Sequence, residues 1–185
     1  MNITTHKLLG FVAVIAPALH SFTDVMEWLQ GGFSPLQLWL NYLAFLPIPV
    51  IMVGLYAASS DNQSITSLTG AVLYGFAFVY FSHTVLIAIE NGIPDYETLW
   101  TRLGSFYTFN GALMIAGGAM FGIPLLRMRY FPQWTVVLFL TGIGLNLVLT
   151  FLPVPDIMQT IGTLFRNIGI AGMGLYLLRN NKAVT

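Results

Sequence analysis

Six apolar segments, each about as long as a membrane-spanning helix, make up most of this sequence. They are Leu8–Trp28, Leu36–Ala58, Thr69–Glu90, Ser105–Leu126, Trp134–Leu152 and Ile157–Leu178. A helix needs about 20 mostly apolar residues to cross the hydrocarbon core of a bilayer. The sequence therefore predicts an all-α, polytopic membrane protein, a bundle of six transmembrane helices that forms a single transmembrane domain over residues 1–185.

The amino-acid composition excludes several other classes of protein. Only 8% of the residues are charged, whereas soluble domains contain about 25%. The chain has no cysteine, which excludes disulfides, thiolate metal sites and a cysteine nucleophile. Its formal net charge is zero, and no basic segment suggests a nucleic-acid partner. The expected surroundings are the lipid bilayer.

The distribution of Lys and Arg predicts the orientation. An even number of spans places both termini on one side of the membrane. The basic residues expected on that side are Lys7, Arg127, Arg129, Arg179 and Lys182. The opposite side has only Arg102 and Arg166. Since positively charged loops stay in the cytoplasm, we expect a multi-pass protein of the cell membrane with both termini cytoplasmic.

An ionisable stripe closes the first apolar segment. His20, Asp24 and Glu27 follow one another at i, i+4 and i+7, which places them on one face of a helix. Ionisable groups within a membrane are costly and by default mark a functional site or a pairing network. The stripe is therefore the first candidate site.

Other polar residues fall in the same outer half of the predicted bundle, whereas the inner half is almost purely apolar. The candidate catalytic residues are His20, Asp24, Glu27, His83 and Glu90. The candidate substrate-binding residues are Asn41, Arg102, Tyr107, Asn110 and Asn146. This asymmetry predicts a polar pocket in the outer half of the membrane, closed on the inner side by an apolar plug.

A weak internal repeat accompanies this asymmetry. His20 and Glu27 have the same spacing as His83 and Glu90, and the two helices that carry them are expected to run parallel. The six spans are therefore compatible with three helical-hairpin pseudo-repeats, of which the third has lost the pair.

The pocket chemistry favours a function on a lipid-soluble small molecule. A histidine beside a carboxylate can transfer protons at neutral pH. An isoprenoid, a sterol-like molecule, a quinone or an acyl compound could enter such a pocket sideways from the outer leaflet. The protein would then bind this small hydrophobic ligand or act on it as a membrane-embedded isomerase, cyclase or hydrolase.

Three alternatives use the same residues differently. His20, Asp24 and His83 could hold a divalent metal in a membrane hydrolase or oxidase. His20 and His83 could be the axial ligands of a b-type haem. The ionisable groups could also form a purely structural network in an accessory membrane subunit. The sequence favours no cofactor and assigns no metal ligand.

Overall fold

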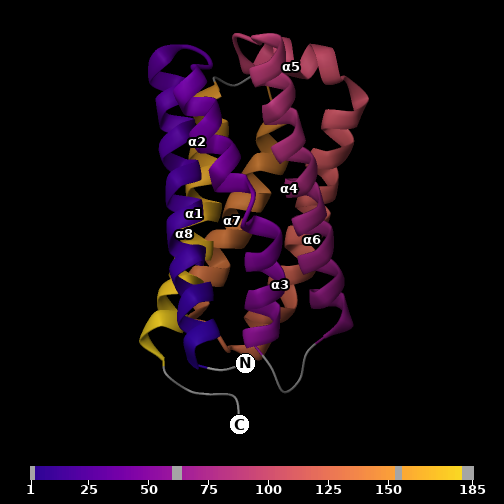
Figure 1. Cartoon of the computed structure of the whole chain (residues 1–185). Helices are drawn as coiled ribbons and strands as arrows, with labels where there is room; N and C mark the ends of the chain where they lie inside the picture. The colour runs from indigo at the N-terminus through magenta and orange to yellow at the C-terminus, as the bar shows by residue number, and fades with distance from the viewer. Residues whose placement is uncertain (1–2, 60–63, 153–155, 181–185) are drawn as a thin grey trace.

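The computed structural model describes residues 3–59, 64–152 and 156–180, and every regular element among them is a helix (Figure 1). The helices are α1 (Ile3–Gln30), α2 (Pro35–Phe45), α3 (Ile48–Ala58), α4 (Ile65–Asn91), α5 (Tyr96–Leu103), α6 (Ser105–Met128), α7 (Gln133–Leu149) and α8 (Asp156–Arg179). The all-α prediction is confirmed for this part of the chain.

The long helices stand side by side, and the short helix α5 lies across one end of the bundle (Figure 1). We call this end the α5 end. The first described residue of α1 and the last of α8 both lie at the opposite end. Helix α8 packs against α1 and α7, while α4 packs against α6, α3 and α2.

Five segments are long and apolar enough to cross a membrane. They are Ile3–Gln30, Pro35–Ala58, Ile65–Asn91, Ser105–Met128 and Ile157–Arg179. The fifth predicted span, Trp134–Leu152, becomes α7, which has 17 residues. Its length of about 26 Å is somewhat less than a hydrocarbon core of about 30 Å. The chain is thus a polytopic helical membrane protein with five long spans and one shorter apolar helix.

The second predicted span is broken. The sequence predicted one helix over Leu36–Ala58, but α2 ends at Phe45 and α3 begins at Ile48. Proline has no backbone N–H and cannot donate to the carbonyl four residues earlier. Pro47 and Pro49 therefore leave the carbonyls of Leu43 and Phe45 without their helical donors, which explains the interruption.

Close helix packing depends on glycines. A Cβ atom on Gly70 of α4 would lie 2.6 Å from the backbone oxygen of Gly117 in α6. A Cβ atom on Gly10 of α1 would lie 2.8 Å from the backbone oxygen of Gly174 in α8. Small residues let the backbones of membrane helices approach each other closely. The van der Waals packing that results holds the helices together, because lipid tails are as apolar as the helices and supply no hydrophobic driving force. The main helix pairs therefore meet backbone to backbone.

The half of the bundle away from the α5 end buries mainly apolar side chains. Its most buried members include Ile51, Met52, Leu55, Phe121, Leu125, Phe139, Ile170 and Met173. His6 is a buried exception, and both of its ring nitrogens lack a hydrogen-bond partner among the described residues. The sequence-based site prediction did not include this histidine.

Candidate functional site

Buried polar side chains gather inside the bundle, most of them in the half nearer the α5 end, and they come from α1, α2, α4, α7 and α8. We call this group the polar core. Its members are His20, Thr23, Asp24, Gln37, Asn41, Tyr74, Asn146, Arg166 and Asn167. Nothing in the apolar composition of the spans requires such a cluster, so its presence needs a structural or a functional explanation.

His20 and Asp24 are the ionisable pair of α1. His20 Nε2 lies 3.5 Å from Asp24 Oδ1, and the two side chains are 6% and 17% exposed. The spacing of four residues on one helix produces this approach without help from other elements. The His20 ring packs edge-on against Phe45 and Phe78, with centroid distances of 4.6 and 6.0 Å. Two aromatic rings therefore fix the orientation of the imidazole.

Hydrogen bonds tie this part of α1 to its neighbours. Thr23 Oγ1 lies 2.7 Å from the His20 carbonyl oxygen and 3.2 Å from Asn41 Oδ1 on α2. Asn167 Nδ2 on α8 donates to Ser21 Oγ at 3.0 Å. The structure thus places Asn41 in the core and adds Asn167, which the list of predicted site residues did not contain, as a second anchor.

Arg166 reaches the polar core from α8. It is 3% exposed, and its guanidinium carbon lies 5.7 Å from the centroid of the Phe78 ring. Its Nη1 donates to Met114 Sδ at 3.1 Å and to Asn146 Oδ1 at 3.5 Å. The charge of Arg166 also acts on His20 and Asp24. A cation inside the bundle therefore influences the ionisable pair of α1.

The sequence-based list of site residues omitted Arg166. A signal was available, because an arginine in the middle of an apolar segment is as unusual as the stripe on the first one. The position of Arg166 in the sequence, however, could not show whether its side chain enters the bundle or extends to the membrane surface.

Several polar atoms of the core have no hydrogen-bond partner among the described residues. They are His20 Nδ1, both amide atoms of Gln37, the Tyr74 hydroxyl and Arg166 Nε. A buried polar atom left unsatisfied costs about 1–3 kcal/mol. Buried groups of this kind are normally satisfied by ordered water or by a bound molecule. These atoms of the core are therefore free to form hydrogen bonds with water or with a bound molecule.

Four further predicted residues lie in or beside the core. Glu27 and Tyr107 are half-buried, and the charges of Asp24 and Glu27 act on Tyr107. Asn110 is buried but donates to the Phe106 carbonyl of its own helix at 2.9 Å. Asn146 is the fourth, and its Nδ2 donates to the Gln159 side chain at 3.1 Å. These contacts give Asn146 a direct place in the core and leave Asn110 at its margin.

The structure does not bring His83, Glu90 or Arg102 into the core. His83 and Glu90 are exposed on the outside of α4. The pseudo-repeat therefore fails in three dimensions, because His20 faces into the bundle and His83 faces away from it. Residues with equal spacing on two helices can face different directions, because the spacing does not determine how each helix is rotated about its own axis.

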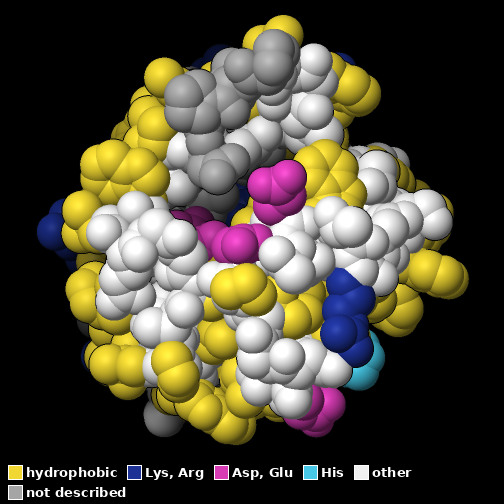
Figure 2. Space-filling model, turned by 90° about the horizontal axis from the view of Figure 1, so that it is seen from above, with side chains coloured by type: hydrophobic (Ala, Val, Ile, Leu, Met, Phe, Trp, Pro, Cys, Tyr) yellow, Lys and Arg dark blue, Asp and Glu magenta, His cyan; other side chains and the backbone are white. Residues whose placement is uncertain are grey.

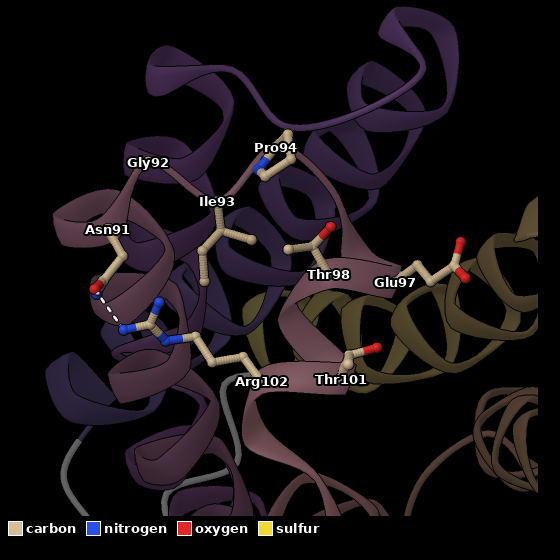
Figure 3. Close-up of a pocket in the computed structure, with 8 residues that line it drawn as sticks. All are labelled: Asn91, Gly92, Ile93, Pro94, Glu97, Thr98, Thr101 and Arg102. Atoms are coloured by element: carbon tan, nitrogen blue, oxygen red, sulfur yellow. Dashed lines mark hydrogen bonds between the residues drawn. The ribbon is translucent and has the colours of Figure 1, made fainter.

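Arg102 belongs instead to an open pocket at the α5 end (Figure 3). This pocket has a volume of about 500 Å³ and lies between the end of α4 and α5. Arg102 Nη2 donates to Asn91 Oδ1 at 2.6 Å, while Glu97 and Thr101 point away from this pair. Asp95 caps α5 by accepting a hydrogen bond from the Thr98 amide at 2.7 Å, which lowers the pKa of the Asp95 carboxyl. The exposed side chains do not converge on one point.

The positions of the histidines also bear on the metal and haem alternatives. Among the described residues, no three His, Asp or Glu side chains lie close enough together to hold one metal ion. The expected ligand set of His20, Asp24 and His83 is therefore not assembled. The same separation keeps His20 and His83 from facing each other as the axial ligands of one haem.

The surface of the α5 end is hollowed (Figure 2). In Figure 2, acidic side chains lie beside a hollow near the middle of this end. The polar core lies in this same half of the bundle. The acidic side chains at its surface and the buried, basic Arg166 distinguish this half from the opposite one, whose described charged residues are all basic and exposed.

No protein-family model, curated protein or solved structure matches the chain. The functional assignment therefore rests on the geometry of the polar core.

Proposed function

We propose that the polar core binds a small lipid-soluble molecule and transfers a proton to or from it. His20 and Asp24 form the acid–base pair, and Arg166 stabilises negative charge on the bound molecule. The observation that carries this proposal is the set of unpartnered atoms on His20, Tyr74 and Arg166, which surround the same Phe78 ring.

The geometry of the imidazole supports a division of roles. His20 Nε2 faces Asp24, whereas Nδ1 has no partner among the described residues. Asp24 is thus placed to orient the ring and to stabilise its protonated form, and Nδ1 is the atom open to a bound molecule. A fixed cation such as Arg166 is most effective where water is excluded, because the attraction is then weakly screened.

The surroundings of the core limit the class of molecule. Phe45, Phe78 and Met114 form apolar walls beside the charged groups. A ligand that fits them has an apolar body and one polar group, as in an isoprenoid, a sterol-like molecule, a quinone or an acyl compound. The corresponding reactions are isomerisation, cyclisation or hydrolysis.

The test identifies the small molecules that remain bound to the protein during purification. After mild detergent extraction, mass spectrometry should find one such molecule enriched on the wild-type protein. Asp24→Asn and His20→Gln should each reduce its occupancy by about tenfold, since a hydrogen bond to a charged group contributes about 1.5–3 kcal/mol.

The matched control is Glu97→Gln, which removes an exposed carboxylate at the α5 end. This variant should retain the molecule like the wild type. Identical small-molecule profiles for the wild type and Asp24→Asn would contradict the proposal.

A structural role is the second candidate, and specific contacts favour it. The bonds from Asn167 to Ser21 and from Thr23 to Asn41 each join two helices. Such bonds between membrane helices typically contribute about 0.6 kcal/mol. On this alternative, variants of the core lose stability but do not change what the protein retains.

We also propose that the α5 end faces the outside of the cell and that both termini are cytoplasmic. At the opposite end the described basic residues are Lys7, Arg127, Arg129 and Arg179, all exposed; Lys182 lies outside the described residues. At the α5 end, Arg102 is the only exposed basic side chain among the residues that the structure describes. The positive-inside rule then gives the orientation.

Single cysteines test this orientation cleanly because the natural chain has none. Glu97→Cys lies at the α5 end, and Gln133→Cys lies at the other end; both positions are exposed. A membrane-impermeant maleimide should label Glu97→Cys in intact cells and Gln133→Cys only after permeabilisation. The reverse pattern would invert the topology.

A further inference from the structure

We propose that a groove on the lipid-facing side of α2, α3 and α4 binds a single-chain amphiphile through an oxygen of its head group. The groove has a volume of about 220 Å³. The residues that line it include Tyr42, Leu46, Pro49, Val79, His83 and Leu86. It is open to the outside of the bundle, since Leu46 and Val79 are 47% and 55% exposed.

The groove lies within the membrane. His83 is eight residues before Asn91, the last residue of α4, which has 27 residues. This places it about 12 Å from the end of a helix about 40 Å long, hence inside a hydrocarbon layer about 30 Å thick. The molecules available at this depth are those of the bilayer.

His83 is the feature that distinguishes the groove from an ordinary lipid-facing surface. An ionisable side chain exposed at this depth is costly, and such residues usually mark a ligand or ion pathway. The imidazole lies 6.5 Å from the Tyr80 ring, and no hydrogen bond to it occurs within the described part of the chain. A hydroxyl or carboxyl group of a bound amphiphile would supply the missing partner.

The break between α2 and α3 forms part of the groove. Leu46 and Pro49, which flank this break, both contribute to the lining. Irregular backbone at membrane depth is tolerated where protein covers it or where it lines a cavity. Discontinuous helices of this kind also build the binding sites of many transporters.

The size of the groove sets the kind of occupant. Pockets that enclose a whole small molecule usually measure about 300–1,000 Å³, more than the 220 Å³ available here. The groove therefore holds a head group and the first few carbons, while the remaining chain lies in the bilayer along Val79 and Leu86. This geometry fits a single acyl or prenyl chain better than a rigid ring system.

The groove is separate from the polar core. Phe45 precedes Leu46 in the chain, and its ring packs against His20 with a centroid distance of 4.6 Å. His20 faces the inner side of this wall, and His83 lines the outer groove. Binding in the groove therefore does not depend on the proposed acid–base function.

Photo-crosslinking in lipid nanodiscs tests the groove. The probes are a long-chain fatty acid and a long-chain alcohol that carry a diazirine near the head group, and an apolar hydrocarbon diazirine of equal length. The acid and the alcohol should label peptides that contain Val79–Leu86 and Tyr42–Pro49 in preference to the rest of the bundle. The hydrocarbon should label all lipid-facing helices alike.

Three variants and a control sharpen the test. Val79→Trp fills the groove and should abolish the preference, and His83→Leu should weaken labelling about fivefold through the loss of one hydrogen bond. His83→Gln keeps a hydrogen-bonding side chain and should restore most of the labelling. Phe76→Trp adds bulk to another exposed position of α4 and should leave labelling unchanged.

The outcomes separate this proposal from the function of the core. Equal labelling of the groove by the hydrocarbon probe, or no effect of Val79→Trp, would overturn the groove as a specific site. Asp24→Asn should leave groove labelling intact. Loss of labelling in a folded Asp24→Asn protein, checked by circular dichroism, would overturn the separation of the two sites.

Discussion

Replacing Gly70 by alanine is expected to destabilise the bundle by about 2–3 kcal/mol, the upper part of the range for overpacking. The added Cβ would collide with the backbone amide of Phe121 and would lie 2.6 Å from the Gly117 oxygen. These are backbone atoms of α6, which cannot rotate aside as a flexible side chain can. Relief therefore requires α4 and α6 to separate along their interface. Reversible unfolding in mixed micelles, followed by circular dichroism, measures the loss.

Gly111→Ala is the control for Gly70→Ala, because this substitution is expected not to destabilise the protein. It lies in α6, and a Cβ atom at this position would have nothing within 4 Å. Alanine is favoured over glycine in a helix by about 0.5–1 kcal/mol, so Gly111→Ala should be neutral or slightly stabilising. Equal changes in the free energy of unfolding for Gly70→Ala and Gly111→Ala would show that the close approach of α4 and α6 is not required.

The second large effect is expected for Arg166→Met, which should destabilise the protein by about 2–3 kcal/mol, because buried hydrogen bonds from a charged group are lost. Methionine keeps an unbranched apolar side chain but removes the positive charge that acts on Asp24. It also removes the hydrogen bond to Asn146 and the contact with the Phe78 ring. Met114 Sδ and Asn146 Oδ1 then remain inside the bundle without this donor.

A double variant and a surface control identify the cause of this loss. Arg166→Met combined with Asp24→Asn should lose less stability than the sum of the two single variants, because the charge of Arg166 acts on Asp24. Arg102→Met removes an exposed arginine whose side chain bonds to Asn91, and it should change stability by less than about 1 kcal/mol. Similar losses for Arg166→Met and Arg102→Met would contradict a buried electrostatic role for Arg166.

Much of the architecture follows from local sequence. Long apolar segments with few charges must form helices in a bilayer, because every backbone group there needs a partner within its own segment. Some helix starts are equally local: Ser34 accepts a hydrogen bond from the Gln37 amide at 3.4 Å, and Asp95 caps α5. The approach of His20 to Asp24 is local as well, since a spacing of four residues on one helix suffices.

The tertiary structure decided which residues share a site. A membrane helix that is apolar on all sides does not reveal by its sequence which face turns inward, because lipid and protein interior are equally apolar. His20 and His83 each precede a glutamate by seven residues, so the sequence predicted the same catalytic role for both. In the structure, His20 is buried among aromatic rings and His83 lines an outer groove. The position of Arg166 inside the bundle depends on how α8 packs against α1 and α7, and the first of these contacts joins opposite ends of the chain, which local sequence cannot specify.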